Sequence, residues 1–339
     1  YNGRANLNID IAKNLQLNVK LAGSISDRHE PSTPGALDIG GYAGIITMAA
    51  RFPGLTATYL QNGEVGLGPK LQGSPVAWAN CKSNYREDND RFRGNLDLTY
   101  KPVDGLTLKL IGGFNYRLNR VHNYRTDLIL TGGKSTGPSS LKETSYRTLY
   151  KTLQATAEYM KSFSNHNIDV IAGYTWEDER QSTLEGGRVS FPSDDVQYLT
   201  AGGADGQTNA GGGYDWAIQS VFGRASYNYA ERYLFEATLR YDGSSRFPKN
   251  SKYGLFPSVA AGWRVSEESF WKNSHSLDFF NNLKIKASFG ILGNNNIGNY
   301  PYQSVYTLSA AQNYVFGATY TQGAAVTTYV DPTLKWERN

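Results

Sequence analysis

The side chains best suited to contact a ligand are aromatic and cationic groups in long polar segments of the chain. Exposed aromatic faces can stack on sugar rings, while neighbouring polar groups fix the orientation of the bound molecule. Arg246, which follows two serines, could contact a substrate, a plug or a partner. The candidates for substrate binding are Tyr42, Trp78, Tyr85, Tyr214, Trp216 and Arg246.

A structural interpretation competes at each of these positions. The aromatic rings could simply pack the loops that carry them. Around Arg246, the chain could form a shaped turn in which Gly243 supplies backbone freedom and Phe247 packs the loop down. Both interpretations stay open on sequence alone.

Groups for metal binding lack the spacing that a metal site needs. None of the four histidines takes part in a His-Glu-x-x-His pattern or a comparable ligand set. They are His29, His122, His166 and His275. The lone Cys81 has no second cysteine for a disulfide or a structural zinc site. We therefore expect neither a metal site nor a cofactor.

Groups for catalysis also lack a suitable context. The acidic runs 177–179 and 194–195 suggest paired carboxylates or a calcium site, but adjacent acids on an extended chain point in opposite directions. The glycines 211–213 lack the strand and helix of a phosphate-binding loop, so we expect a flexible loop there. The protein is not expected to be an enzyme.

The composition favours an all-β protein. The sequence contains 24 Tyr, 14 Phe, 6 Trp and 36 Gly but only 2 Met, a mix that suits twisted strands better than helices. The net charge of +4 comes from scattered residues rather than from a basic stripe, so we expect no nucleic-acid partner.

Alternation with a period of two recurs along the chain and predicts strands that are polar on one face and apolar on the other. Residues 91–101 and 106–117 form such a pair around a turn at 102–105. Similar hairpins are expected at 5–11 with 15–25, 149–161 with 167–177 and 217–229 with 233–242, and further strands at 256–266 and 283–291.

The connections alternate between short turns and long polar loops. Residues 12–14, 102–105, 162–166 and 230–232 are short, whereas 26–90, 118–146 and 178–216 far exceed the typical loop of about 4 to 6 residues. Outer-membrane barrels combine short turns on one side with long loops on the other.

Tyrosines and tryptophans near the expected strand ends fit the aromatic girdles of such a barrel, although ordinary cross-strand pairs would also place them there. The lumen-facing row is expected to contain Arg91, Arg93, Asp97, Lys109 and Arg117, which could tune what passes or simply hydrate the wall.

Several segments in the last third of the chain carry a more specific pattern. They are RYDGSSRF at 240–247, YGLFPS at 253–258, AGWRVSEESF at 261–270, LKIKASFG at 283–290, GNN at 293–295 with Tyr300, and DPTLKWE at 331–337. In order and spacing they resemble the barrel of the SusC/RagA family of TonB-dependent outer-membrane transporters.

This resemblance implies an antiparallel transmembrane β-barrel in the cell outer membrane, surrounded by lipid. It also implies TonB-energised import of an oligosaccharide or peptide nutrient, with a SusD-like surface lipoprotein as partner. The family resembles the 22-stranded plugged class, whereas this chain shows about ten clear strands, or about twelve with the segment 302–329. We therefore expect residues 1–339 to be a portion of the barrel, with the plug domain, its TonB-contacting segment and the C-terminal strands outside this chain.

Two alternatives remain at this stage. A passive porin would share the alternating strands and long loops but would need neither a plug nor a lipoprotein partner. A soluble β-rich carbohydrate-binding domain would use the aromatic content for stacking, but the outer faces of its strands should then be polar.

Overall fold

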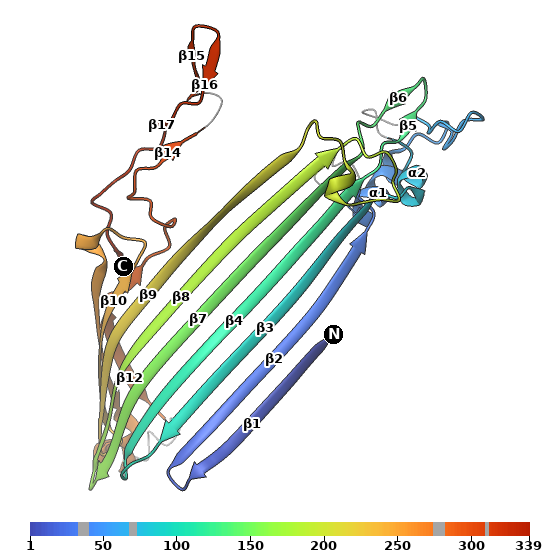
Figure 1. Cartoon of the computed structure of the whole chain (residues 1–339). Helices are drawn as coiled ribbons and strands as arrows, with labels where there is room; N and C mark the ends of the chain where they lie inside the picture. Colours follow the sequence, from blue (N-terminus) through green and yellow to red (C-terminus); the bar gives the residue numbers. More distant parts are fainter. Residues whose placement is uncertain (33–40, 68–72, 274–281, 309–311) are drawn as a thin grey trace.

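The computed structural model describes residues 1–32, 41–67, 73–273, 282–308 and 312–339. Its main feature is a single curved wall of ten antiparallel strands in the order β1-β2-β3-β4-β7-β8-β9-β10-β11-β12 (Figure 1). The strands are β1 (Asn2–Ala12), β2 (Leu15–Glu30), β3 (Asn84–Tyr100), β4 (Leu106–Arg125), β7 (Ser140–Phe163), β8 (His166–Val189), β9 (Thr208–Tyr229), β10 (Tyr233–Ser244), β11 (Tyr253–Arg264) and β12 (Lys284–Gly290). The predicted all-β antiparallel fold is confirmed.

The strand register separates a polar face from an apolar face. Directly opposed residues of neighbouring antiparallel strands point to the same side of a sheet. Arg93 lies opposite Asn115, which lies opposite Tyr150, and these residues belong to the polar face. Leu98 lies opposite Leu110 on the other face. The predicted alternation between the two faces is therefore confirmed in β3 and β4.

The apolar face is exposed in this chain. Leu110 and Phe114 in β4 keep 41% and 44% of their accessible surface, and Phe235 in β10 keeps 59%. Aromatic side chains lie along both margins of this face, and some contact one another, as in the stacked rings of Tyr241 and Tyr253 with centroids 5.0 Å apart. An apolar band between two aromatic margins matches the lipid-facing surface of a membrane barrel.

The short connections lie where the sequence predicts them, at the lower end of the wall in Figure 1. One of them joins β9 to β10, where Ala230 and Glu231 both adopt positive φ angles, of 52° and 58°. Two successive positive φ angles are typical of the type I′ turn, whose twist matches that of the strands it joins. The turn therefore forms without the Asn or Gly that usually signals it.

The strands extend much further than the sequence indicates. β7 and β8 each contain 24 residues, and the long loops expected at 118–146 and 178–216 are shortened accordingly. The expectation of a flexible loop at glycines 211–213 is wrong, because these residues continue β9 opposite residues 182–184 of β8. Beyond the apolar band both faces are polar, so the period-two signal disappears although the ladder of hydrogen bonds continues. Cross-strand ion pairs such as Arg120–Asp90, at 3.0 Å, take the place of apolar contacts there.

Small elements lie at the upper end of the wall and in the C-terminal segment (Figure 1). They are the helices α1 (Gly41–Arg51) and α2 (Pro75–Asn80) and the two-stranded pairs β5 (Ile129–Leu130) with β6 (Lys134–Ser135), β13 (Gly293–Asn294) with β18 (Glu337–Arg338), β14 (Tyr306–Thr307) with β17 (Ala325–Val326) and β15 (Tyr314–Phe316) with β16 (Thr319–Thr321). Within the described residues, the segment 302–329 thus forms separate short hairpins and adds no strand to the ten-stranded sheet. Among the helices described, none is long and apolar enough to cross a membrane.

Candidate functional site

A cluster of aromatic and charged side chains lies on the polar face, across β7, β8 and β9. Tyr214 and Trp216 are two residues apart in β9 and therefore share a face, and Glu179 of β8 is directly opposite Trp216. One carboxylate oxygen of Glu179 accepts hydrogen bonds from Tyr214 Oη at 3.2 Å and from Trp216 Nε1 at 3.3 Å. The neighbouring strand adds Tyr150, whose ring centroid is 6.2 Å from that of Trp216.

Tyr150 is itself fixed by β8, because its Oη donates a hydrogen bond of 2.9 Å to Glu177. Glu177 and Glu179 are two residues apart and therefore also share the polar face. We call the group of Tyr150, Glu177, Glu179, Tyr214, Trp216 and Arg246 the Trp216 cluster.

Arg246 reaches the cluster from the turn that follows β10. Its guanidinium carbon lies 5.3 Å from the centroid of the Trp216 ring, a cation–π arrangement. Two further contacts hold the side chain from the opposite direction: Nε donates to Asn299 Oδ1 at 3.1 Å, and Nη1 donates to the carbonyl of Asn295 at 3.2 Å. A cation held in this way covers one face of the indole.

The turn that carries Arg246 is fixed mainly by packing. Phe247 is 1% exposed and contacts Trp336, with ring centroids 5.1 Å apart, so the interpretation that Phe247 packs the loop down is confirmed. The expectation that Gly243 supplies backbone freedom is wrong, since its φ is not positive. A side chain at Gly243 would instead meet the ring of Tyr253, with a Cβ only 2.3 Å from the nearest ring atom.

Tyr300 contacts β9 next to the cluster, at a residue that points to the opposite face of the strand. Its hydroxyl donates a hydrogen bond of 3.0 Å to Asp215, the residue between Tyr214 and Trp216. Burial raises the pKa of the Tyr300 hydroxyl, and the Asp215 carboxylate raises it further, while a hydrogen bond with Ser245 acts in the opposite direction. The hydroxyl therefore stays protonated at neutral pH and acts as a donor.

The other sequence candidates lie away from the Trp216 cluster. Tyr85 is on the polar face of β3, where its hydroxyl donates to Glu87 at 3.3 Å and the guanidinium of Arg28 lies 5.7 Å from its ring centroid. Tyr42 is on α1 with 61% of its surface exposed. Trp78 is on α2 and is completely buried, so its ring presents no face to a ligand in this chain. The structure thus brings together Tyr214, Trp216 and Arg246 but not Tyr42, Trp78 and Tyr85.

The histidines take part in local polar contacts. His122 Nδ1 is 2.6 Å from Glu143, and His166 Nδ1 is 2.7 Å from the hydroxyl of Tyr227. His29 lies 3.4 Å from Asp27, and His275 is outside the described residues. Across the described residues, no three His, Cys, Asp or Glu side chains are grouped so as to hold a metal ion.

Sequence reasoning missed Tyr150, Glu177 and Glu179. Alternation placed Tyr150 and Glu177 at the ends of expected strands, but only the pairing of β7, β8 and β9 shows that they face Trp216. The predicted lumen-facing row does share this polar face. Its members are Arg91, Arg93, Asp97, Lys109 and Arg117.

Three of the distinctive sequence segments of the last third, 240–247, 253–258 and 331–337, meet at one place. Phe247, Phe256 and Trp336 form a buried cluster, with Ile291, Ile297 and Leu334 packed against it. Trp336 Nε1 donates a hydrogen bond of 2.9 Å to the carbonyl of Lys252. These segments therefore build the aromatic support behind Arg246 rather than a separate site.

Comparisons with known proteins agree with this architecture. Residues 34–339 match the family model described as TonB dependent receptor-like, beta-barrel. The chain is 30% identical over 338 residues to TonB-dependent receptor P3 of Formosa agariphila, covering 98% of this chain and 33% of that protein. It is 29% identical over 311 residues to TonB-dependent receptor SusC of Bacteroides thetaiotaomicron, covering 88% of this chain and 28% of that protein.

Among solved structures, the RagAB peptide importer in its closed-closed state superposes with a TM-score of 0.78 at 23% sequence identity. The superposition covers 100% of this chain and 37% of the matched chain, and at this identity it shows a shared fold alone. The chain spans only about a third of the length of these proteins.

Proposed function

The chain belongs to the TonB-dependent receptor-like β-barrel family, and on that premise we propose that it forms part of a transporter that imports an oligosaccharide or peptide nutrient with energy supplied through TonB. As a member of this family it is an outer-membrane β-barrel protein, similar to SusC and RagA. Import, rather than an enzymatic reaction, is the proposed activity.

The observation that carries the proposal is the separation of the two faces of the sheet. The apolar face is suited to lipid, and the polar face presents charged and aromatic groups to an enclosed space when the wall closes. The Trp216 cluster lies on this polar face, near the middle of β7, β8 and β9 and beside the turn that follows β10. A nutrient that enters from outside would meet it there.

The proposed partners follow from the family. We propose a SusD-like surface lipoprotein that acts with the barrel at the cell surface, and TonB, which would act through a plug and an N-terminal region outside this chain. The matched RagAB structure is that of a peptide transporter, which supports the peptide alternative for the cargo. The aromatic rings of the Trp216 cluster support the oligosaccharide alternative.

The residues proposed to contact cargo are Tyr214, Trp216 and Arg246, which form one cluster, together with the separate Tyr42 and Tyr85. Trp78 is left out because its side chain is fully buried. The proposed role of each remaining residue is to orient a polar cargo through ring stacking and hydrogen bonds.

The two alternatives have weaker support. A soluble carbohydrate-binding domain does not account for the exposed apolar face, on which Phe92 and Phe235 keep 58% and 59% of their surface. A passive porin would share that face but would need no lipoprotein partner.

Purification of the tagged full-length protein from native membranes tests this proposal against the porin alternative. We expect a surface lipoprotein to co-purify in a stoichiometric amount, and we expect no steady ion conductance from the purified complex in a planar bilayer. Recovery of the barrel alone, combined with large open-channel currents, would indicate a porin.

A further inference from the structure

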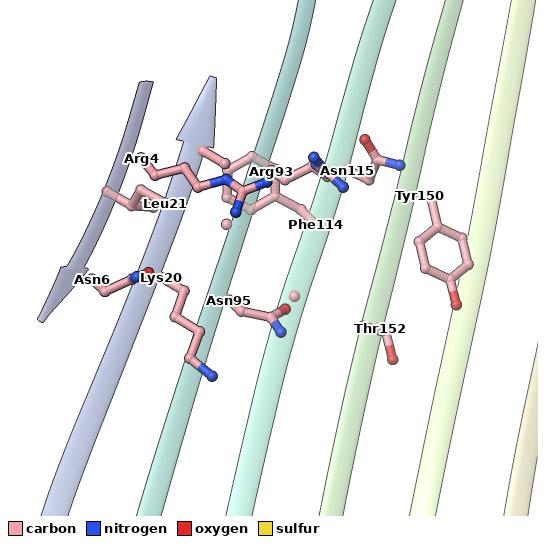
Figure 2. A pocket seen from close by; sticks show the side chains of 13 residues that line it. Arg4, Asn6, Lys20, Leu21, Arg93, Asn95, Phe114, Asn115, Tyr150 and Thr152 are labelled. Carbon is pink, nitrogen blue, oxygen red and sulfur yellow. The ribbon is translucent and has the colours of Figure 1, made fainter. Parts of the chain in front are cut away.

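A hollow with cationic walls lies on the polar face of β1 to β4, beside the Trp216 cluster. Its volume is about 570 Å³, and its polar lining comes from Arg4, Lys20, Arg93, Asn95 and Asn115, with Tyr150 at its margin. Figure 2 shows these side chains projecting from adjacent strands, with Arg4 extending across β2 and Arg93 extending toward Asn115. We call this group the cationic hollow.

The strand register explains why the wall is hollow at this point. Ala22 of β2 lies directly opposite both Arg4 of β1 and Arg93 of β3, so a small side chain separates two long ones. Gly113 of β4 lies opposite Asn95 in the same way, and a Cβ there would be 2.3 Å from Asn95 Oδ1. Small residues therefore form the floor, and cationic or carboxamide side chains form the walls.

The cations of the hollow lack protein counter-charges. In the described part of the chain, Arg4, Lys20 and Arg93 form no ion pair and make no side-chain hydrogen bond, whereas Arg86 and Arg120 on the other face are paired with Asp88 and Asp90. Arg91 and Arg117, directly opposite each other on the polar face, are likewise without ion pairs among the described residues and extend the positive charge.

The nearest acidic groups of the polar face lie outside the hollow. Asp97, two residues beyond Asn95 in β3, accepts a hydrogen bond from Thr99 at 3.3 Å. In β8, Glu177 accepts one from Tyr150, and Glu179, directly opposite Tyr150, accepts hydrogen bonds from Tyr214 and Trp216. Several like charges on one concave surface repel one another and attract anions. An anionic ligand would therefore bind with a favourable Coulomb energy and without first displacing a protein carboxylate.

The uncharged lining indicates what else the ligand must carry. The carboxamides of Asn6, Asn95 and Asn115 can each donate and accept hydrogen bonds, as hydroxyl groups do. In the described structure the Oδ1 atom of Asn115 is shielded from solvent and accepts no hydrogen bond, so the side chain would have to turn before this oxygen could bind a ligand hydroxyl. Tyr150 connects the hollow to the ring of Trp216, 6.2 Å away between centroids.

We propose that the cationic hollow binds an acidic oligosaccharide, with carboxylate or sulfate groups of the sugar on Arg4, Lys20 and Arg93 and sugar hydroxyls on the asparagines. This inference names a substrate class and so rests on the proposed import function. An acidic peptide shares the negative charge but lacks the dense hydroxyl groups that the carboxamide lining matches.

The test is isothermal titration calorimetry on the detergent-solubilised full-length protein with its native partners. The probes are a hexameric oligogalacturonate, a neutral galacto-oligosaccharide of equal length, a sulfated oligosaccharide and a hexaglutamate peptide. We expect the acidic sugars to bind at least about tenfold more tightly than the neutral sugar and the peptide, because charge-assisted hydrogen bonds are the stronger ones. We also expect this preference to shrink as salt is raised.

Two matched pairs of variants assign the binding to the hollow. Ala22→Asp places a carboxylate between Arg4 and Arg93 and should weaken acidic-sugar binding by about tenfold or more, whereas the neutral Ala22→Asn should change it by less than about threefold. Arg93→Gln should weaken binding similarly, and Arg120→Gln, on the opposite face, should not. Heat modifiability on gels and the thermal midpoint of each variant show whether it remains folded.

Three outcomes would overturn the inference. Equal affinity for acidic and neutral sugars would show that binding does not depend on the charge of the ligand. Selective binding of hexaglutamate would show that the ligand class is an acidic peptide. The third outcome is that the unaltered protein binds no anion while Arg93→Gln lowers the thermal midpoint. The cations would then form ion pairs with an acidic part of the same protein. If cells still import a neutral nutrient in an energy-dependent way, the proposed function survives each of these results.

Discussion

At the scale of single residues, Trp216 is held from two directions. Glu179 accepts a hydrogen bond from its Nε1 atom at 3.3 Å, and the guanidinium of Arg246 lies 5.3 Å from its ring centroid. A rigid indole loses little conformational entropy when it binds a ligand, so the entropic cost of its contact with a polar cargo is small.

Replacement of Trp216 by Ala should therefore weaken cargo binding by about 1 kcal/mol, roughly fivefold, since a stacked ring contributes about that much. Trp216→Phe retains a ring but loses the bond to Glu179, and should lose only part of this affinity. Calorimetry on the purified full-length protein measures both. Unchanged affinity in Trp216→Ala would remove the cluster from the binding surface.

Gly293 provides a test of the aromatic support behind Arg246. A Cβ at this position would lie 2.2 Å from the Phe256 ring, which is itself buried against Trp336. Because the ring has no room to move, Gly293→Ala should destabilise the protein by about 1 to 3 kcal/mol. Gly298→Ala is the matched control, since nothing lies within 4 Å of the corresponding Cβ. Equal thermal midpoints for the two variants would contradict the packing described here.

Residue type alone identified part of the site. Tyr214, Trp216 and Arg246 are candidates because aromatic and cationic groups suit a polar ligand, and the structure brings them together. Trp78 has the same chemistry, but α2 buries it. Burial of a single ring in an irregular segment depends on tertiary contacts for which the sequence carries no periodic signal.

At the scale of the strand, neighbouring residues face opposite environments. Leu110 of β4 lies opposite Leu98 and Ala155 on the apolar face, whereas Ile111 lies opposite Asp97 and Gln154 on the polar face. The two aliphatic side chains are adjacent in sequence, so they form a matched pair for substitution.

Leu110→Arg should impair insertion by about 2 to 4 kcal/mol, the cost of arginine on the lipid face near the middle of the bilayer. Ile111→Arg should be tolerated, because its new charge enters the polar face beside Asp97. Folding of the full-length variants into lipid vesicles, followed by heat modifiability, measures the difference. Equal impairment by both substitutions would show that the faces are assigned wrongly.

The connection after β11 is expected to respond to pH. Hydrogen bonds from Tyr233 and then Trp263 hold the pKa of Glu268 below its ordinary value of 4.5, and Arg232 acts in the same direction. A lowered pKa in the folded state stabilises the connection above pH 4.5, and this contribution is lost as the pH falls through the folded value.

The tryptophan fluorescence of the folded full-length protein should therefore change below pH 4.5 in the unaltered protein, and less in Glu268→Gln, which has no charge to lose. A fluorescence titration from pH 7 to pH 3 on both proteins gives the comparison. Identical curves would show that the Glu268 carboxylate does not stabilise this connection.

Periodicity predicted the strands well only within the lipid-facing band. The hairpin around residues 102–105 was found because Leu106, Leu108 and Leu110 alternate with polar residues. The outer halves of β7 and β8 are polar on both faces, so alternation predicts loops where the structure has strands. Hydrogen bonds and ion pairs between strands leave no simple pattern along a single strand.

At the scale of the whole molecule, the ten-stranded wall has two edges in the described structure, at β1 and β12. Unpaired backbone groups at an edge cost several kcal/mol each in lipid. We therefore expect that the 339 residues alone do not insert stably. A heat-modifiable, protease-resistant band after refolding of this polypeptide into bilayers would refute that expectation.

The central claim is energised import, and uptake of a labelled nutrient by whole cells tests it most directly. Cells that contain the full-length gene should accumulate the nutrient, and accumulation should stop when the gene is deleted, when TonB is deleted or when the proton gradient is collapsed. The nutrient is chosen as the oligosaccharide or peptide that gives the largest growth difference between wild-type and deletion strains. Uptake that depends on the gene but continues without TonB or a proton gradient would contradict the claim and indicate passive diffusion through the barrel.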